Sequence, residues 1–188
     1  MELVAGITPS DNSIEIFAEP EKFGKCLFIK AGTTRPFREL PLDVLDDLRE
    51  ELSTDKRAIE GLRLMGVDDE WEKLETYNFC NRGRLDGVPD ITESGKKSKE
   101  FVDCGKRGRC PGENKVCSPV VINGSRITFR ELECWKLIGQ QLSYKQVMFE
   151  MGFRRETAVN SLMERLRIKL ACSDKVGIAL KAKEIGII

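Results

Sequence analysis

The amino-acid sequence predicts a mainly α-helical protein in three parts, and three observations support this fold class. Apolar residues recur at helical spacing within residues 1–78, after two short β-like stretches, which predicts a small helical or α+β region. Residues 79–122 are rich in glycine, lysine, arginine and cysteine and lack periodicity, which predicts a loop-rich segment. Residues 126–188 contain three amphipathic stretches with a tight break at Gly152, which predicts a helical unit.

The N-terminal part is expected to begin with a β-hairpin and to continue with helices. Residues 13–19 and 26–32 are apolar or alternating and flank the turn-like stretch EPEKFG. The chain is expected to be irregular from Arg35 to Leu40. Pro41 then marks a helix start, because its fixed φ suits the first helical turn. The apolar face of that helix is expected to contain Leu42, Leu45, Leu48 and Leu52.

Two further helices are expected before the loop-rich segment. Ser53 or Thr54 is expected to cap the first of them, which ends at Gly66. Asp68 is expected to cap the next one. The inward-facing residues of the two helices are expected to be Ile59, Leu62, Met65, Trp71, Leu74 and Tyr77.

Charge is distributed unevenly along a chain whose formal net charge is +0. Residues 1–90 carry 12 Lys/Arg and 20 Asp/Glu, residues 91–125 carry 7 and 4, and residues 126–188 carry 12 and 7. The acidic first half argues against nucleic acid wrapping around the whole molecule, whereas the basic last third suits binding to phosphates. The acidic helices are either a solvated face or a surface for a protein partner.

The chain contains seven cysteines and no histidine. The odd cysteine count, without a signal peptide, argues against a disulfide scaffold. The lack of histidine excludes Ser-His and Cys-His nucleophiles and zinc sites that use histidine. No apolar run approaches the ~20 residues of a membrane helix, so we expect a cytoplasmic protein without a membrane partner.

Cysteines gather in the loop-rich segment with the spacing C-x23-C-x5-C-x6-C. Four thiolates can close a tetrahedral zinc site or hold an iron–sulfur cluster, and a loop of this length needs such a staple to be ordered. The spacing lacks the tight CxxC pair of most zinc sites, so zinc, an iron–sulfur cluster and plain thiols without metal all stay open. The candidate ligands are Cys80, Cys104, Cys110 and Cys117, whereas Cys26, Cys134 and Cys172 are expected to be core residues.

The C-terminal part has local signals for each of its helices, after an expected linker at residues 123–125. Thr128 and Glu131 have the spacing of a capping box, and that helix is expected to end at Gly139. Ser143 is expected to cap a second helix, which breaks at Gly152. The third helix is expected from about Arg154 to Leu170, with Ala158, Leu162, Leu166 and Leu170 facing inward.

The stretch ITFRELECWKLIGQQLSYKQVMFEMGF, followed by RRETAVNSLMERLRIKLACS, resembles the LuxR/GerE-type helix-turn-helix and, more distantly, region 4 of sigma factors. The resemblance covers residues 126–185, about a third of the chain, and DKVGIALKAKEIG matches the fourth helix of that family. Gly139, Gln141 and Met148 depart from the family pattern, and one residue is inserted in the third helix. The resemblance implies a four-helix DNA-binding domain and assigns its base contacts to within about one position.

The resemblance also implies which residues bind duplex DNA. Ser143, Lys145 and the start of the second helix would hold phosphates, whereas the start of the third helix would reach base edges. Each residue has an alternative role as a helix cap or solvated surface. The implied DNA-binding residues are Ser143, Lys145, Arg154, Arg155, Thr157, Asn160 and Arg167.

Two functions are compatible with these patterns. The first is a DNA-binding transcription regulator with a metal-stabilised or redox-responsive N-terminal part. The acidic surface of that part would contact RNA polymerase or another protein. The resemblance implies that such a regulator acts as a homodimer. The second is a metal-stapled interaction protein of phage or mobile-element type, in which the helix-turn-helix contacts protein. We do not expect an enzyme, because no acid, base or nucleophile constellation is present in the sequence.

Overall fold

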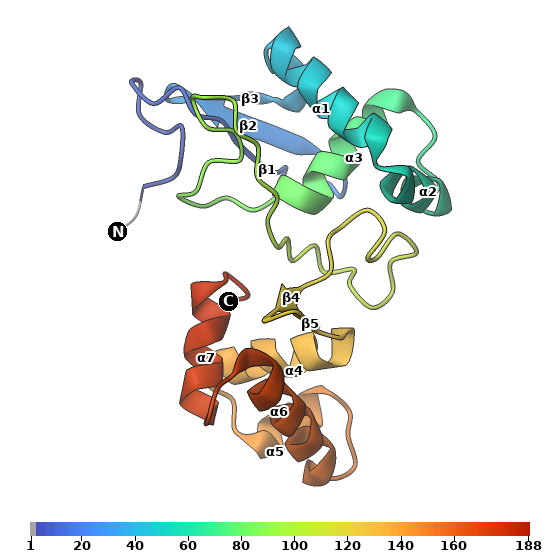
Figure 1. Cartoon of the computed structure of the whole chain (residues 1–188), viewed down its shortest axis with the longest axis vertical. Helices are drawn as coiled ribbons and strands as arrows, with labels where there is room; N and C mark the ends of the chain where they lie inside the picture. The colour runs from blue at the N-terminus through green and yellow to red at the C-terminus, as the bar shows by residue number, and fades with distance from the viewer. Residues whose placement is uncertain (1–2) are drawn as a thin grey trace. The chain divides into compact units, whose positions relative to one another are not determined.

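The computed structural model describes residues 3–188. The chain forms two compact units, Met1–Ser118 (unit 1) and Pro119–Ile188 (unit 2), and each is described by itself (Figure 1). Helices predominate and a small antiparallel sheet accompanies them, which confirms the expectation of a mainly α protein. Within residues 3–188 we find no helix whose length and apolarity would let it span a membrane.

Unit 1 begins with an antiparallel sheet of order β1-β2-β3. The predicted hairpin is confirmed, because β1 (Glu15–Ala18) pairs with β2 (Cys26–Lys30). The chain was expected to be irregular from Arg35 to Leu40, but Arg35 and Pro36 belong to a third strand, β3 (Thr33–Pro36). It forms because Ala31 and Gly32 adopt positive φ angles of 48° and 75°, which close a tight hairpin turn between β2 and β3.

The first helix, α1 (Leu42–Thr54), begins after Pro41 as predicted. Its buried face contains Leu45, Leu48 and Leu52. Leu42 was expected on the same face, but it is 76% exposed. Leu42 is the first residue of the helix and does not belong to the hydrophobic core of unit 1.

The next two helices begin one or two residues later than predicted. The side chain of Asp55, not that of Ser53 or Thr54, caps α2 (Lys56–Leu64) by accepting a hydrogen bond from the Ala58 amide. The two hydroxyls instead donate to carbonyls one turn back, so both residues still belong to α1. Likewise, Asp69 rather than Asp68 caps α3 (Glu70–Arg82), through the amide of Glu72.

Helix α3 is the centre of unit 1. It contacts β1 and β2 on one side and α1 and α2 on the other, and every residue from Leu74 to Arg82 is buried. Packing on both sides explains why this helix has polar residues inside, namely Glu75, Thr76, Asn78, Asn81 and Arg82, each of which then needs a partner within the protein.

The predicted loop-rich segment is confirmed for residues 83–118, which contain turns and bridges rather than helices or extended strands. The segment packs on unit 1 rather than forming a separate body. Ile91 bridges to both Ile14 and Lys97, and the amide of Glu100 donates to the Asn81 carbonyl at 2.8 Å. Several of its residues, including Val102 and Val116, are buried.

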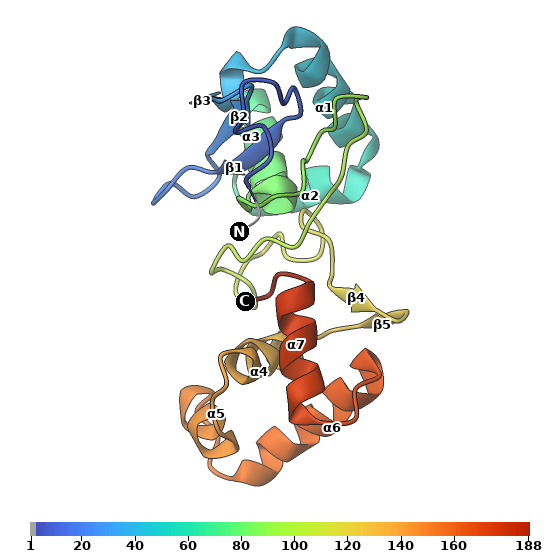
Figure 2. The ribbon, with the colours of Figure 1, turned by 90° about the vertical axis from the view of Figure 1, so that its left-hand side faces the viewer.

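Unit 2 opens with a hairpin and continues with helices. The expected linker at residues 123–125 is part of this hairpin, because Asn123 and Gly124 have φ angles of 49° and 73° and form its two-residue turn. Figure 2 shows α7 lying beside α4. The elements are β4 (Val121–Ile122), β5 (Ser125–Arg126), α4 (Phe129–Gly139), α5 (Tyr144–Glu150), α6 (Glu156–Leu170) and α7 (Lys175–Glu184).

The predicted helix signals of unit 2 are confirmed at three positions. Thr128 and Ser143 each form a capping box, and Gly152 has φ 68° at the break after α5. Trp135 is fully buried and its indole nitrogen donates to the Ile178 carbonyl at 2.7 Å, which ties α4 to α7. The core of the unit also contains Ile138, Val147, Val159, Met163 and Leu166.

Candidate functional site

The turn between α5 and α6 is held by backbone hydrogen bonds. The amide of Phe153 donates to the Met148 carbonyl at 2.9 Å, and the amide of Gly152 donates to the Phe149 carbonyl at 3.1 Å. Only glycine adopts the left-handed conformation of position 152 without strain. The turn therefore fixes the direction in which the chain enters α6.

Helix α6 has a buried face and an exposed face. The inward positions are Val159, Leu162, Met163, Leu166 and Leu170, whereas Ala158 is only half-buried. The predicted inward positions were spaced by four residues from Ala158 to Leu170, and this prediction was wrong for Ala158. A helix turns every 3.6 residues, so the buried stripe alternates steps of three and four.

The predicted base-reading residues lie together at the start of α6. Arg154 and Arg155 precede the helix, which begins two residues later than predicted, and Thr157 and Asn160 lie in its first turns. All four are exposed. Thr157 and Asn160 lie outside the buried stripe of α6, and the two arginines lie just before the helix. The predicted exposure of the four residues is therefore confirmed, while their contact with DNA stays a prediction.

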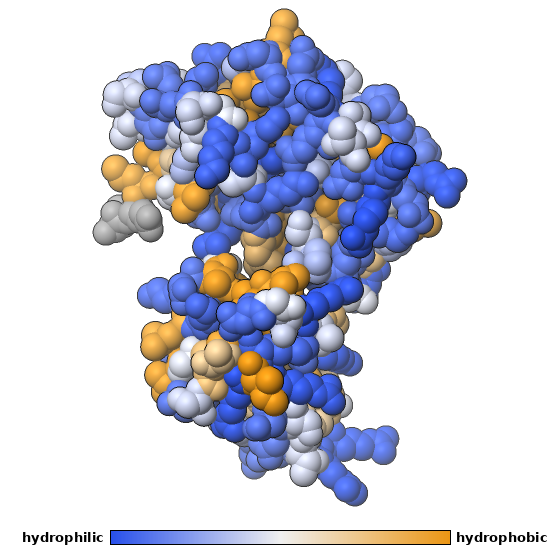
Figure 3. Space-filling view, viewed as in Figure 1, coloured by the Kyte–Doolittle hydropathy of each residue, from blue (hydrophilic) through white to orange (hydrophobic). Residues whose placement is uncertain are grey.

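The predicted phosphate-binding residues lie at the start of α5. Lys145 is exposed. Ser143 is exposed as well, but its hydroxyl accepts from the Gln146 amide at 3.3 Å and donates to the Gln146 side chain at 2.8 Å. The hydroxyl of Ser143 is therefore engaged as a helix cap. Residues on the face of unit 2 shown in the lowest part of Figure 3 are mainly hydrophilic, although Phe149 on α5 is 67% exposed.

Arg167 does not join the other predicted residues. It lies in the second half of α6, half-buried, and its Nη1 is 3.3 Å from Glu164 Oε2. Its Nε is buried without a hydrogen-bond partner among the described residues. Sequence reasoning missed Ser161 and Arg165, which are exposed on the same face as Thr157 and Asn160; helical spacing from Thr157 would have found both.

Three of the four cysteines predicted as metal ligands lie at one hydrophobic core of unit 1. Cys80 is buried in the last turn of α3, and Cys104 and Cys117 pack against the same hydrophobic core. Burial raises the pKa of the Cys80 thiol, and the charges of Cys117, Cys104 and Cys110 raise it further. All seven cysteines are free thiols. Among residues 3–188, no three cysteine or carboxylate side chains are already arranged to hold a metal ion.

The prediction that the other three cysteines are core residues is confirmed for two of them. Cys26 and Cys134 are buried, as predicted, but Cys172 is only half-buried. Burial, then the Glu75 carboxylate and Cys80, raise the pKa of Cys26, so a fifth thiol lies near Cys80. The thiol of Cys26 donates to the Glu75 carbonyl at 3.7 Å.

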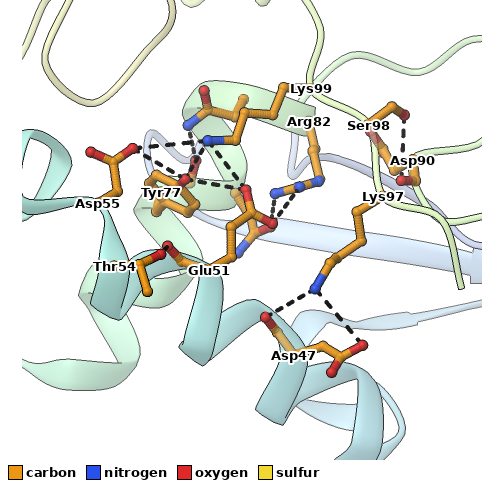
Figure 4. A network of polar contacts seen from close by, with 12 residues as sticks. Asp47, Glu51, Thr54, Asp55, Tyr77, Arg82, Asp90, Lys97, Ser98 and Lys99 are labelled. Atoms are coloured by element: carbon orange, nitrogen blue, oxygen red, sulfur yellow. Dashed lines mark hydrogen bonds and ion pairs between the residues drawn. The ribbon is translucent and has the colours of Figure 1, made fainter.

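A partly buried polar network that the sequence did not indicate joins α1, α3 and the loop-rich segment (Figure 4). Arg82 donates to Glu51 at 2.7 Å and to the Asn78 side chain at 2.9 Å. Lys99 lies 3.2 Å from Glu51 and donates to the Tyr77 hydroxyl. Burial, then the charges of Glu51 and Asp55, raise the pKa of Tyr77, so its hydroxyl stays neutral within this network.

A second group of buried polar residues consists of carboxyls. Asp90 accepts from the Ile16 amide at 2.8 Å, and Glu15 accepts from the Asp86 amide at 2.8 Å. Glu100 accepts from the Arg84 amide at 2.8 Å. Each carboxyl fixes the loop-rich segment, which explains why acidic side chains are tolerated inside unit 1.

Comparison of the chain with family models, with curated proteins and with solved structures gave no match.

Proposed function

We propose that the protein is a DNA-binding transcription regulator that contacts duplex DNA through α5 and α6. The observation that carries the proposal is the exposure of Arg154, Arg155, Thr157 and Asn160 at the start of a helix that has another face buried in unit 2. Side chains in this arrangement are held by the core of unit 2 and project from it. A helix presented in this way fits the major groove of B-DNA.

Charge supports phosphate binding by unit 2. Residues 119–188 carry 12 Lys/Arg and 7 Asp/Glu, a net charge of +5. Side chains cap the starts of α4, α5 and α7, but Arg155 at the start of α6 makes no side-chain cap. The first-turn amides of α6 and the positive end of its dipole would therefore favour a phosphate oxygen.

Base recognition would come from the same end of α6. An arginine can donate two hydrogen bonds to guanine, and an asparagine can bind adenine through its amide. Arg154 and Arg155 supply the first chemistry and Asn160 the second. The resemblance of residues 126–185 to the LuxR/GerE type supports the assignment, with α7 as the fourth helix of that domain. Under this proposal Arg167 has a minor role, because Glu164 engages its guanidinium.

The proposal is tested by fluorescence anisotropy of the full chain with duplex DNA at several salt concentrations. We expect the logarithm of the affinity to fall linearly with the logarithm of salt between about 50 and 200 mM. Arg154→Ala and Arg155→Ala should each weaken binding and reduce the salt slope by about one. Lys183→Ala is the matched control, because it removes one exposed charge from α7.

Folded protein without salt-dependent binding to a random duplex pool would refute the proposal. Equal effects of Lys183→Ala and the two arginine variants would show that only net charge matters. Helical content by circular dichroism must be the same in all variants for the comparison to hold.

The second candidate is a protein-interaction module, and one observation favours it. Phe149 on α5 is 67% exposed, and a large aromatic side chain at this position offers apolar area to a protein partner. The exposed acidic residues of α1, including Asp43, Asp46 and Asp47, would suit a basic patch on a partner such as RNA polymerase. If Phe149→Ser abolished a protein complex while DNA binding by wild-type protein was absent, this second function would replace the first.

A further inference from the structure

A hydrogen bond joins the chain beside two cysteines of unit 1 at the end of α3. The Asn81 side chain donates to the Val116 carbonyl at 3.0 Å. Asn81 follows Cys80 in the chain and Val116 precedes Cys117, so this hydrogen bond ties the backbone next to Cys117 to the helix turn that contains Cys80. Because Asn81 is fully buried, the contact is shielded from water.

Two further turns bring in the other cysteines. A Cβ atom on Gly83 would lie 3.4 Å from the Val102 side chain, so the chain leading to Cys104 runs along the end of α3. Arg107 donates to the Val102 carbonyl at 3.3 Å, which folds the next residues back. The amide of Glu113 donates to the Cys110 carbonyl at 3.1 Å and begins the turn toward Cys117.

The segment between these cysteines is pressed closely against α2. A Cβ atom on Gly61 would lie 2.7 Å from the Val116 side chain and 2.8 Å from that of Lys115. Arg57 donates to the Asn114 carbonyl at 3.0 Å. The backbone of residues 112–117 therefore has little freedom to move away from the end of α3.

We propose that Cys80, Cys104, Cys110 and Cys117 bind one zinc ion as thiolates, and that this ion fastens the loop-rich segment to α3. The four sulfurs come from a helix end and from three turns that contacts with α2 and α3 already hold. Side-chain rotations would have to close them around the ion. The proposal concerns unit 1 only and is independent of DNA binding.

Four thiolates require a cation of charge two or more at their centre. Each negative sulfur raises the free energy of ionising the next one. Arg107 is buried in the same segment, but one guanidinium does not balance four negative charges. Zinc both lowers the cost of ionisation and uses sulfur ligands in a tetrahedral arrangement.

We favour zinc over an iron–sulfur cluster because a single ion with sulfurs at about 2.3 Å needs less room than a cluster. Cys26 is not included, because its thiol is buried on β2 and donates to the Glu75 carbonyl.

The proposal is tested by metal analysis of the full chain, purified under reducing conditions. We expect about one zinc ion per chain in the wild type and in Cys172→Ser, a matched control that removes a half-buried thiol of unit 2. Cys104→Ser and Cys110→Ser should retain at least about tenfold less zinc. Cobalt(II) added in place of zinc should give the visible absorption of tetrahedral thiolate coordination.

A second measurement does not depend on the folding of variants. Alkylation of the native wild type, followed by peptide mass spectrometry, should leave Cys104, Cys110 and Cys117 protected until a chelator is added, and zinc chloride should restore the protection. Folded wild-type protein that lacks zinc and takes up none would overturn the proposal. Brown protein with iron and sulfide would also overturn it, in favour of a cluster.

Discussion

The guanidinium of Arg82 lies 2.7 Å from the carboxylate of Glu51, and the arginine side chain is only 1% exposed. The arginine ends α3 and the glutamate belongs to α1, so this pair joins two helices through the interior of unit 1. The charge of Arg82 is the first favourable influence on Glu51, and it holds the pKa of that carboxyl below its usual value against the effect of burial.

Glu51→Ala is expected to destabilise unit 1 strongly. The substitution leaves a buried guanidinium without its counter-ion, and breaking a buried pair in this way costs about 3 kcal/mol or more. Asp46→Ala is the control, because it breaks the exposed pair with Arg49 at 2.7 Å, which contributes about 0–1 kcal/mol. Urea unfolding followed by circular dichroism measures both; equal losses would show that the buried pair contributes no more than the exposed one.

Three carboxyls make the stability of unit 1 depend on pH. Burial is the largest cause in each case: it raises the pKa of Glu15 to about 8, that of Asp90 to about 9 and that of Glu100 to about 7. In the unfolded chain these groups release their protons near pH 4. Stability from the three carboxyls is therefore fully present below about pH 4 and is lost as the pH rises through 7 to 9.

We expect the urea midpoint of the wild type to fall between about pH 6 and pH 9, and to fall less in Glu15→Gln. The amide of glutamine keeps an oxygen for the Asp86 amide but carries no proton that is released in this range. Glu50→Gln, on the exposed face of α1, should behave as the wild type does. A pH dependence of Glu15→Gln as steep as that of the wild type would contradict the assignment.

Local signals in the sequence were sufficient for the helices of unit 2, but not for its hairpin. Thr128, Ser143 and Gly152 act within four residues of their partners, so their roles can be found without knowledge of the fold. The same holds for the exposure of Thr157 and Asn160, because helical periodicity alone separates the two faces of α6.

The interior of unit 1 could not be predicted in the same way. Arginine and aspartate usually lie on the protein surface. Arg82 and Asp90 are nevertheless buried, because their partners Glu51 and Ile16 come from other elements of the chain. Periodicity carries no information about contacts of this range. The cysteines are intermediate, since their spacing suggested a group but only the contacts of Asn81 indicate how they approach one another.

Gly61→Ala is expected to destabilise unit 1 although alanine favours helices. The added Cβ atom would overlap with the side chains of Lys115 and Val116 and lie 3.2 Å from the Val116 amide nitrogen, so the loop-rich segment would have to shift. Overpacking of this kind costs about 1–3 kcal/mol. Arg63→Ala, at an exposed position of the same helix, should change the urea midpoint little. A stabilised Gly61→Ala protein would show that this segment packs loosely on α2.

Asn160→Ala separates base recognition from phosphate binding, if α6 binds DNA as proposed. Asn160 is uncharged and exposed in the second turn of α6, so its loss should leave the salt slope unchanged. It should remove about 1–3 kcal/mol of discrimination at one base pair, measured by anisotropy on duplexes that vary at each position of a selected site. Arg154→Ala should lower the salt slope as well. If Asn160→Ala weakened binding to every duplex equally, the residue would contact the backbone, and the base-reading end of α6 would have to be reassigned toward Ser161 and Arg165.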